Sequence, residues 1–146
     1  MFVPNRLELA WSAGFFDGEG TAHFSLMKHD KRGKDYDYVT TNNRLQLGVD
    51  QSSSVEELNR FRRSVGDVGK VYGPYKPSGN RINHRVRYRY SAMSFEHFQH
   101  VMACIWQFLC SRKRAQLKRV HQGFIQNHDP RWRSLKGKRG MKNRIA

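Results

Sequence analysis

Two carboxylates, those of Asp17 and Glu19, stand where a predicted helix ends. Apolar side chains recur at helical spacing at Leu7, Trp11 and Phe15, so residues 7–18 are predicted to form an amphipathic helix. Carboxylate oxygens are the ligands that a hard divalent cation prefers. Acids at the base of a helix are therefore candidate ligands of a divalent metal ion.

A second stripe on this helix consists of small residues, at Ala10, Gly14 and Gly18. Each glycine inside a helix costs about 1 kcal/mol relative to alanine, so two of them in one short helix need a reason. The usual reason is the close approach of another backbone, which only small side chains permit. A helix pair that meets along this stripe would bring its acids together and build a shared metal site.

Composition points to a polyanionic partner. The 146 residues include 27 Lys and Arg against 12 Asp and Glu, a formal charge of +15. Nucleic acid is the leading partner. A membrane surface is the alternative, but the chain has no long apolar run and no signal peptide. Cys104 and Cys110 point in different directions from one helical stretch, so no disulfide is expected and the protein is predicted to be intracellular.

A zinc site is the weaker metal hypothesis. His97, His100 and Cys104 share one helical face, but a structural zinc ion needs a fourth ligand, and the sequence shows none nearby. We therefore interpret these three residues as packed or half-exposed parts of a helix.

The rest of the chain alternates between strand and helix patterns. Strands are predicted at 21–27, 38–51, 70–75 and 85–90, and further helices at 54–65, 94–109 and 111–126. Residues 28–37 are predicted to be a mobile turn. Ser54 to Glu57 has the form of a capping box, and Ser94 that of an N-cap. Residues 1–128 are predicted to form one domain, and 129–146 a basic C-terminal tail.

This order predicts an α+β fold with an αββαββα core. Two hairpins join into one four-stranded antiparallel sheet, with helices on one face and the other face open and polar. Alternation places these residues on the open face: His23, Ser25, Met27, Arg44, Gln46, Tyr72, Arg85, Arg87 and Arg89.

Residues 12–20, Ser-Ala-Gly-Phe-Phe-Asp-Gly-Glu-Gly, resemble the LAGLIDADG motif of homing endonucleases. Ala13, Gly14, Asp17 and Gly20 match the motif, the two phenylalanines are apolar as required, and Glu19 stands at its second acidic position. Ser12 departs from it, since the family usually has leucine there. The αββαββα order is also that of the family core, so the resemblance covers residues 7–126.

The resemblance implies a homodimer, because only one motif occurs in the chain. The expected interface comprises Ala10, Ala13, Gly14, Asp17 and Gly18. The two sheets would form a saddle about 20 base pairs long over a pseudo-palindromic site. A monomer, in which the glycines serve internal packing, is the alternative.

The resemblance also implies a site-specific double-strand DNA endonuclease that uses Mg²⁺, or another divalent cation, and leaves short 3′ overhangs. Glu19 would be the metal ligand, one from each subunit, helped by the carbonyl of Gly20. Asp17 is expected to be structural, bonding backbone groups near the helix ends, rather than catalytic. Gln51, which closes the second strand, would orient a water molecule. The alternative is a surface glutamine at a strand terminus.

A basic residue near the start of the last helix completes the implied site. The sequence does not choose between Arg112 and Lys113, and both could instead be solvated bases that contact phosphates. Base reading is expected from the open sheet face, where Arg44, Arg85, Arg87 and Arg89 suit guanine and Gln46 suits adenine. The basic tail would add salt-sensitive affinity.

Two other functions compete with the endonuclease. One is a non-cleaving binder of the same fold, either an RNA maturase with intron RNA as its partner or a DNA-binding regulator. The other is a basic structural protein of the ribosomal kind. An intact Glu19 beside Gln51 favours the enzyme, because a pure binder need not keep a metal ligand. The expected location is an organelle (chloroplast or mitochondrion) or a bacterial or phage cytoplasm.

Overall fold

The computed structural model describes the backbone of residues 1–32, 37–76 and 85–127, and the side chains of 1–25, 44–76 and 85–127. Its elements are, in order, α1 (Arg6–Glu19), β1 (Gly20–Arg32), β2 (Asp37–Ser52), α2 (Glu56–Ser64), β3 (Lys70–Tyr75), β4 (Arg87–Ala92), α3 (Phe95–Ile105), a 3-10 turn (Trp106–Phe108) and α4 (Ser111–Asn127). The predicted order of helices and strands is confirmed. The predicted tail, 129–146, lies outside the described residues.

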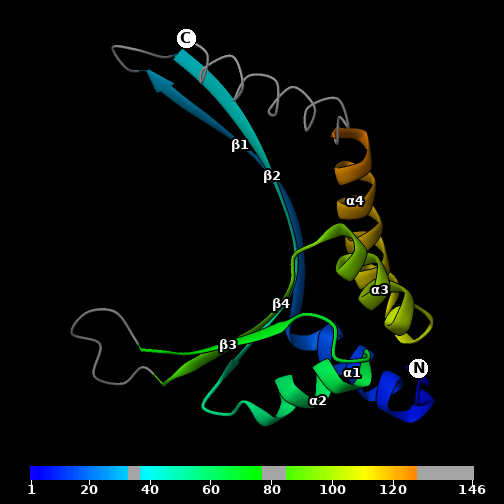
Figure 1. The fold of residues 1–146 in the computed structure, drawn as a ribbon. Coiled ribbons are helices and arrows are strands. Elements are labelled where there is room, and N and C mark those ends of the chain that lie inside the picture. The colour runs from blue at the N-terminus through cyan, green and yellow to red at the C-terminus, as the bar shows by residue number, and fades with distance from the viewer. Residues whose placement is uncertain (33–36, 77–84, 128–146) are drawn as a thin grey trace.

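The four strands form one antiparallel sheet in the order β1-β2-β4-β3. The sheet is curved like a saddle, and the helices cover only its convex side, which leaves the concave side open (Figure 1). The predicted α+β architecture is therefore confirmed.

The core lies between the convex side of the sheet and the helices. The sheet contributes Leu47, Val49 and Tyr90, which are 0–1% exposed. Helical side chains fill the other half, led by Phe16, Phe61, Phe98, Ile105 and Leu117. The Tyr90 ring meets Phe61 edge-on at 4.9 Å between centroids, and its hydroxyl donates to the carbonyl of Val68 at 2.7 Å. Burial raises the pKa of this phenol, so it stays neutral and acts only as a donor.

Helix α1 begins at Asn5, whose side-chain oxygen accepts from the backbone amides of Leu7 and Glu8 at 3.0 and 3.1 Å. Its buried face consists of Leu9, Ser12, Ala13 and Phe16. The stripe predicted from Leu7 is wrong at its first member, because Leu7 is 81% exposed. Periodicity identifies a helix, but only the packing of α2 and the sheet decides which of its faces is covered.

Strand β1 is longer than predicted. Residues 28–32, assigned to a mobile turn, continue the strand and pair with 37–41 of β2. Strand β4 pairs only with residues 47–52 of β2, so the distal halves of β1 and β2 form a two-stranded ribbon. The charged residues and glycine of 28–37 gave no apolar alternation, which is why the pattern missed this part of the strand.

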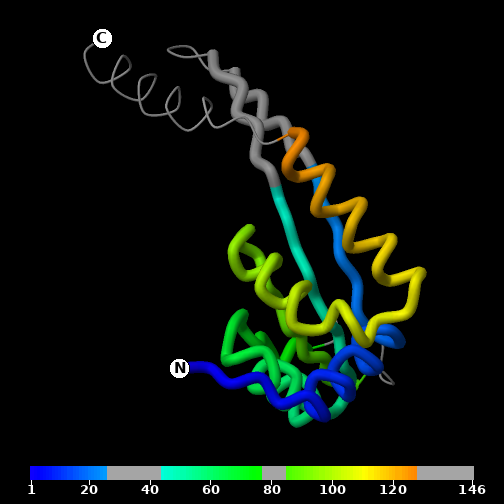
Figure 2. The backbone as a smooth tube through the Cα atoms, turned by 90° about the vertical axis from the view of Figure 1, so that its right-hand side faces the viewer, coloured from blue at the N-terminus to red at the C-terminus, as the bar shows by residue number. Residues whose placement is uncertain are grey.

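Strand β4 starts two residues later than predicted and continues through Ser91 and Ala92. These side chains are buried but small, so they gave little apolar signal. Helix α4 runs along β1 on the convex side, as Figure 2 shows. In the described part of the chain, no helix is long and apolar enough to cross a bilayer.

Candidate active site

The junction of α1 and β1 places Glu19 and Gly20 at one end of the helix. Glu19 is exposed and is paired with none of the described residues, whereas Gly20 is buried. The Phe16 ring lies against the α-carbon of Gly20 so closely that a β-carbon there would collide with it. Gly20 is thus required by the packing of α1 onto its own strand.

Asp17 connects this junction to α4. Its two carboxylate oxygens accept from the backbone amide of Cys110, at 3.1 and 3.2 Å, just before α4 begins. A carboxylate at a helix N-terminus satisfies a free amide and favours the positive end of the helix dipole. The end of α1 therefore fixes the start of α4, which agrees with the structural role expected for Asp17.

Helix α4 then carries Lys113 over the junction. Its ammonium group donates to the carbonyl of Gly20 and lies 5.5 Å from the centroid of the Phe16 ring. Arg112 is exposed and contacts none of the described residues through a hydrogen bond or ion pair. Of the two bases left open by the sequence, the structure brings Lys113 to the junction with Glu19.

Gln51 lies at the end of β2 on the face that packs against the helices. Val49 pairs with Gly20, so Gln51 sits one pleat, about 7 Å, further along the same face. It is half-buried and pairs with Tyr88 of β4. Glu19, Gly20, Gln51 and Lys113 thus gather around one end of α1.

The small-residue stripe of α1 is uncovered. Gly14 and Gly18 are exposed, and a β-carbon added at either would meet no atom within 4 Å. Leu7 lies on the same side of the helix and is also exposed. Among the residues that the structure describes, none packs against these glycines. Ala10 is half-buried beside them.

The prediction that Ala13 belongs to the dimer interface needs correction. Its side chain is fully buried in the core of its own chain, so it is not available to a second copy. Position 13 lies about 100° around the helix from position 14, on the covered side with Leu9 and Phe16. Asp17 keeps its place near the stripe, but its carboxylate is engaged by Cys110 within the chain.

The departure at Ser12 has a structural partner that the sequence did not reveal. Ser12 and Ser64 of α2 are both buried, and their hydroxyl oxygens lie 2.6 Å apart. Ser64 donates to the carbonyl of Phe61 at 2.7 Å, so Ser12 is the donor to Ser64. A complementary small polar residue, 52 positions away, thus replaces the packing of a leucine.

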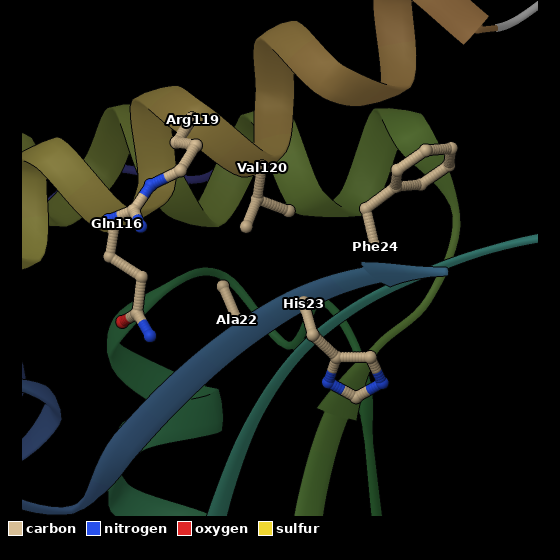
Figure 3. Close-up of a pocket in the computed structure, with 6 residues that line it drawn as sticks. All are labelled: Ala22, His23, Phe24, Gln116, Arg119 and Val120. Atoms are coloured by element: carbon tan, nitrogen blue, oxygen red, sulfur yellow. The ribbon is translucent and has the colours of Figure 1, made fainter. Parts of the chain in front are cut away.

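The open side of the sheet carries most of the residues predicted to contact bases. His23, Arg44, Tyr72 and Arg87 are exposed on it, and Ser25 is half-buried. Figure 3 shows the alternation in β1, since Phe24 lies on the side of α4, beside a hollow of about 370 Å³, while the His23 ring points away from α4. The side chain of Met27 lies outside the described residues.

Two assignments on this side need correction, and a third residue has a partner that the sequence did not reveal. Arg85 precedes β4 and is exposed, because the strand starts only at Arg87. Gln46 is 7% exposed, and its amide donates to the hydroxyl of Ser91 at 3.0 Å, so little of it remains to read a base. Arg89 lies on the open side as predicted, and one edge of its guanidinium forms a two-point ion pair with Asp50. The sequence suggested no role for Asp50.

Two residues of the alternative zinc site, His100 and Cys104, have other contacts in the structure. Nε2 of His100 lies 2.7 Å from the carbonyl of Val65, and the Cys104 sulfur lies 3.6 Å from the same nitrogen. Burial raises the pKa of the Cys104 thiol, which disfavours the thiolate that would bind a metal. Over the described ranges, no cluster of three His, Cys, Asp or Glu could hold a metal ion.

Comparison with solved structures identifies this architecture. The chain has the fold of the LAGLIDADG homing endonucleases. The endonuclease I-CvuI, in complex with its target in the presence of Ca, is 25% identical with a TM-score of 0.56, and the match covers 80% of this chain and 64% of that one. A second structure of I-CvuI, with the I-CreI target and Mg and with the DNA not cleaved, is 24% identical with a TM-score of 0.58. The match covers 80% of this chain and 65% of that one.

A further structure, the group I intron-encoded endonuclease I-CeuI complexed with DNA, is 15% identical with a TM-score of 0.60, and the match covers 87% of this chain and 59% of that one. This chain therefore spans less than two thirds of the length of these relatives. No protein-family model matches the sequence, and no curated protein matches it.

Proposed function

We propose that this protein is a site-specific endonuclease that binds a long pseudo-palindromic DNA as a homodimer and hydrolyses both strands with a divalent metal. The observation that carries the proposal is the convergence of an exposed carboxylate, Glu19, with the Gly20 carbonyl and the Lys113 ammonium at the end of a helix whose glycine stripe is open. The fold shared with the endonucleases supports it.

The residues present suit Mg²⁺ as one part of a site. Glu19 offers an exposed carboxylate and Gly20 a carbonyl, both hard oxygen donors. Mg²⁺ takes about six oxygen ligands, and one chain provides only some of them. The remaining ligands would come from a second chain, from water and from the DNA phosphates. When bound, the metal would supply an activated water and stabilise charge on the phosphate.

The other residues of the junction have roles that follow from their chemistry. Lys113 donates one N–H to the Gly20 carbonyl, and its other N–H groups could donate to a phosphate oxygen or a water molecule. Gln51, one pleat from Gly20, would orient the attacking water through its amide. Asp17 would hold α4, and hence Lys113, in place.

The proposed dimer forms along the open stripe of α1. Two glycines inside a helix cost about 2 kcal/mol together, and the monomer gains no packing from them. Close contact with the same stripe of a second copy would use their small size and cover Leu7. The twofold axis would then place two junctions side by side, one for each DNA strand.

The proposed DNA lies against the concave side of the sheet. That side carries exposed cations, the described helices all lie on the other side, and a β-ribbon fits the major groove. The charge of +15 provides non-specific affinity that falls with salt. Short 3′ overhangs are part of the same proposal, carried over from the family resemblance.

A cleavage selection tests the proposal. Purified protein is incubated with a randomised DNA library in Mg²⁺ or in EDTA, and the new ends are sequenced. We expect Mg²⁺-dependent ends that cluster on one pseudo-palindrome with 3′ overhangs. Tight, salt-sensitive binding without any cutting would instead indicate a non-cleaving binder of the same fold, and the search would move to structured RNA.

A further inference from the structure

The ion pair between Asp50 and Arg89 lies on the open side of the sheet. The two residues stand directly opposite each other in β2 and β4. Nε of Arg89 donates to one carboxylate oxygen at 2.7 Å, and Nη2 donates to the other at 3.0 Å. Because two parallel hydrogen bonds join two planar groups, the guanidinium is fixed in orientation as well as in position.

An acid is unexpected on this surface. Among the sheet residues whose side chains are described, Asp50 is the only acidic residue on the open side, where Lys70, Arg44 and Arg87 are also found. A surface that only neutralises phosphates would be better without it. Fold stability does not explain it either, since both side chains are 37–40% exposed and such ion pairs contribute little.

The geometry of the pair leaves the useful edge of Arg89 free. A guanidinium has two edges that can make paired hydrogen bonds, one through Nε and Nη2 and one through Nη1 and Nη2. The carboxylate occupies the first edge. The second edge has no partner among the described residues, and it matches the O6 and N7 acceptors of guanine in the major groove.

Unlike Arg89, the neighbouring residues on this side are either buried or not held by a carboxylate among the described residues. Gln46 is committed to Ser91 and buried, and the Arg87 guanidinium lies 6.0 Å from the Tyr75 ring without a carboxylate partner. Arg44 is exposed and unpaired with described residues. Long unpaired side chains lose rotamer entropy when they bind a base, whereas a fixed guanidinium has already lost it.

We propose that Asp50 is a positioning residue that fixes Arg89, so that Arg89 reads one guanine in each half-site. The proposal rests on the proposed DNA binding by the open side of the sheet. Asp50 raises specificity at one base pair while its negative charge lowers affinity for DNA in general. A residue that only stabilised the fold would leave base preference unchanged.

Binding-site selection from a randomised library in Ca²⁺ at one fixed salt concentration tests the proposal. The variants are Asp50→Asn, Arg89→Ala and Glu8→Gln. Glu8 is the matched control, because it forms a similar two-point pair with Arg60 between α1 and α2, at 2.9 and 3.0 Å and similar exposure. Arg89→Ala should abolish a guanine preference at one position of each half-site.

Asp50→Asn should weaken that same preference about five- to tenfold, while affinity for unrelated DNA stays equal or rises. Glu8→Gln should leave every base preference as in the wild type. An unchanged preference in Asp50→Asn, or a change at a position other than the Arg89 position, would overturn the proposal. Failure of the wild type to select any site would instead contradict the proposed function, so the two failures are distinguishable.

Discussion

At the scale of single residues, the proposed cleavage chemistry depends on which basic side chain lies near Glu19. Lys113 donates to the Gly20 carbonyl, whereas Arg112, one position earlier, points to solvent. Neighbouring positions on a helix are separated by about 100°, so only one of the two can face the junction. The sequence could not decide this, because the choice depends on the bond from Asp17 that sets where α4 begins.

Substitution of these two basic residues should separate effects on the cleavage rate from effects on DNA affinity. Lys113→Met is expected to slow cleavage at saturating DNA by about tenfold or more, with affinity nearly unchanged, because a proton donor at the reacting phosphate is lost. Arg112→Met should leave the cleavage rate at saturation unchanged and reduce the slope of log K against log salt by about one. Equal slowing by both variants would show that α4 acts only as a basic surface.

The buried serine pair gives a prediction about stability. Ser64→Ala should lower the free energy of unfolding by about 1–3 kcal/mol, because it leaves the Ser12 hydroxyl buried without its partner. Ser12→Ala with Ser64→Ala should cost less than the sum of the two single changes. Urea unfolding of the four proteins measures this, and strict additivity would contradict the hydrogen bond.

At the scale of elements, the four helices and four strands followed well from sequence patterns, and their faces followed less well. Along β2, alternation holds for Leu45, Leu47 and Val49, which are all buried. The same rule placed Gln46 in the open, yet it is buried, because Ser91 of β4 offers it a hydroxyl. Pairing between distant strands is not encoded in the period of either strand.

The pairing of Asp50 with Arg89 was missed for the same reason. Sequence alternation put Arg89 on the open side, but only the register of β2 with β4 makes Asp50 its direct neighbour. Likewise, Leu7 fits an apolar stripe by spacing and is exposed, since no element of the same chain covers that side of α1. Contacts between elements that are distant in the sequence could not be predicted from the periodicity of either element.

The open stripe of α1 leads to a prediction about assembly. Gly14→Gln should convert the proposed dimer to a monomer without loss of folding, because a β-carbon at position 14 meets no atom of the described residues within 4 Å. The variant should even gain about 1 kcal/mol in helix propensity. Sedimentation equilibrium gives the mass, and thermal unfolding gives the stability.

The control for this prediction is Ala103→Gln, a similar enlargement at an exposed position of α3. It should leave the mass unchanged. A wild-type protein that is monomeric at micromolar concentration, or a dimer that persists in Gly14→Gln, would exclude the stripe as the interface.

At the scale of the whole molecule, the carboxylates that form bonds predict how stability depends on pH. Hydrogen bonds from Arg89 hold the pKa of Asp50 below its ordinary value of 3.8, and those from Arg60 hold the pKa of Glu8 below 4.5. A lowered pKa in the folded state adds stability above the unfolded-state value, and this is lost as the pH falls through the folded value.

The melting temperature should therefore be nearly constant from about pH 7 to 5 and fall below about pH 4.5. The difference between wild type and Asp50→Asn should be small, since the pair is exposed, and should shrink as the pH approaches about 3. Thermal melts across this range measure it. A difference that grows on acidification would contradict the ionised pair.

The most direct test of the central claim is the effect of Glu19→Gln on cutting and on binding of the selected site. Glu96→Gln, which removes an exposed carboxylate in the first turn of α3, is the matched control. Glu19→Gln should bind the site within about threefold of wild type and cut it at least about 100-fold more slowly in Mg²⁺, because a metal ligand is lost. Glu96→Gln should cut normally. Full cutting by Glu19→Gln would remove Glu19, and the shared metal site built on it, from the mechanism.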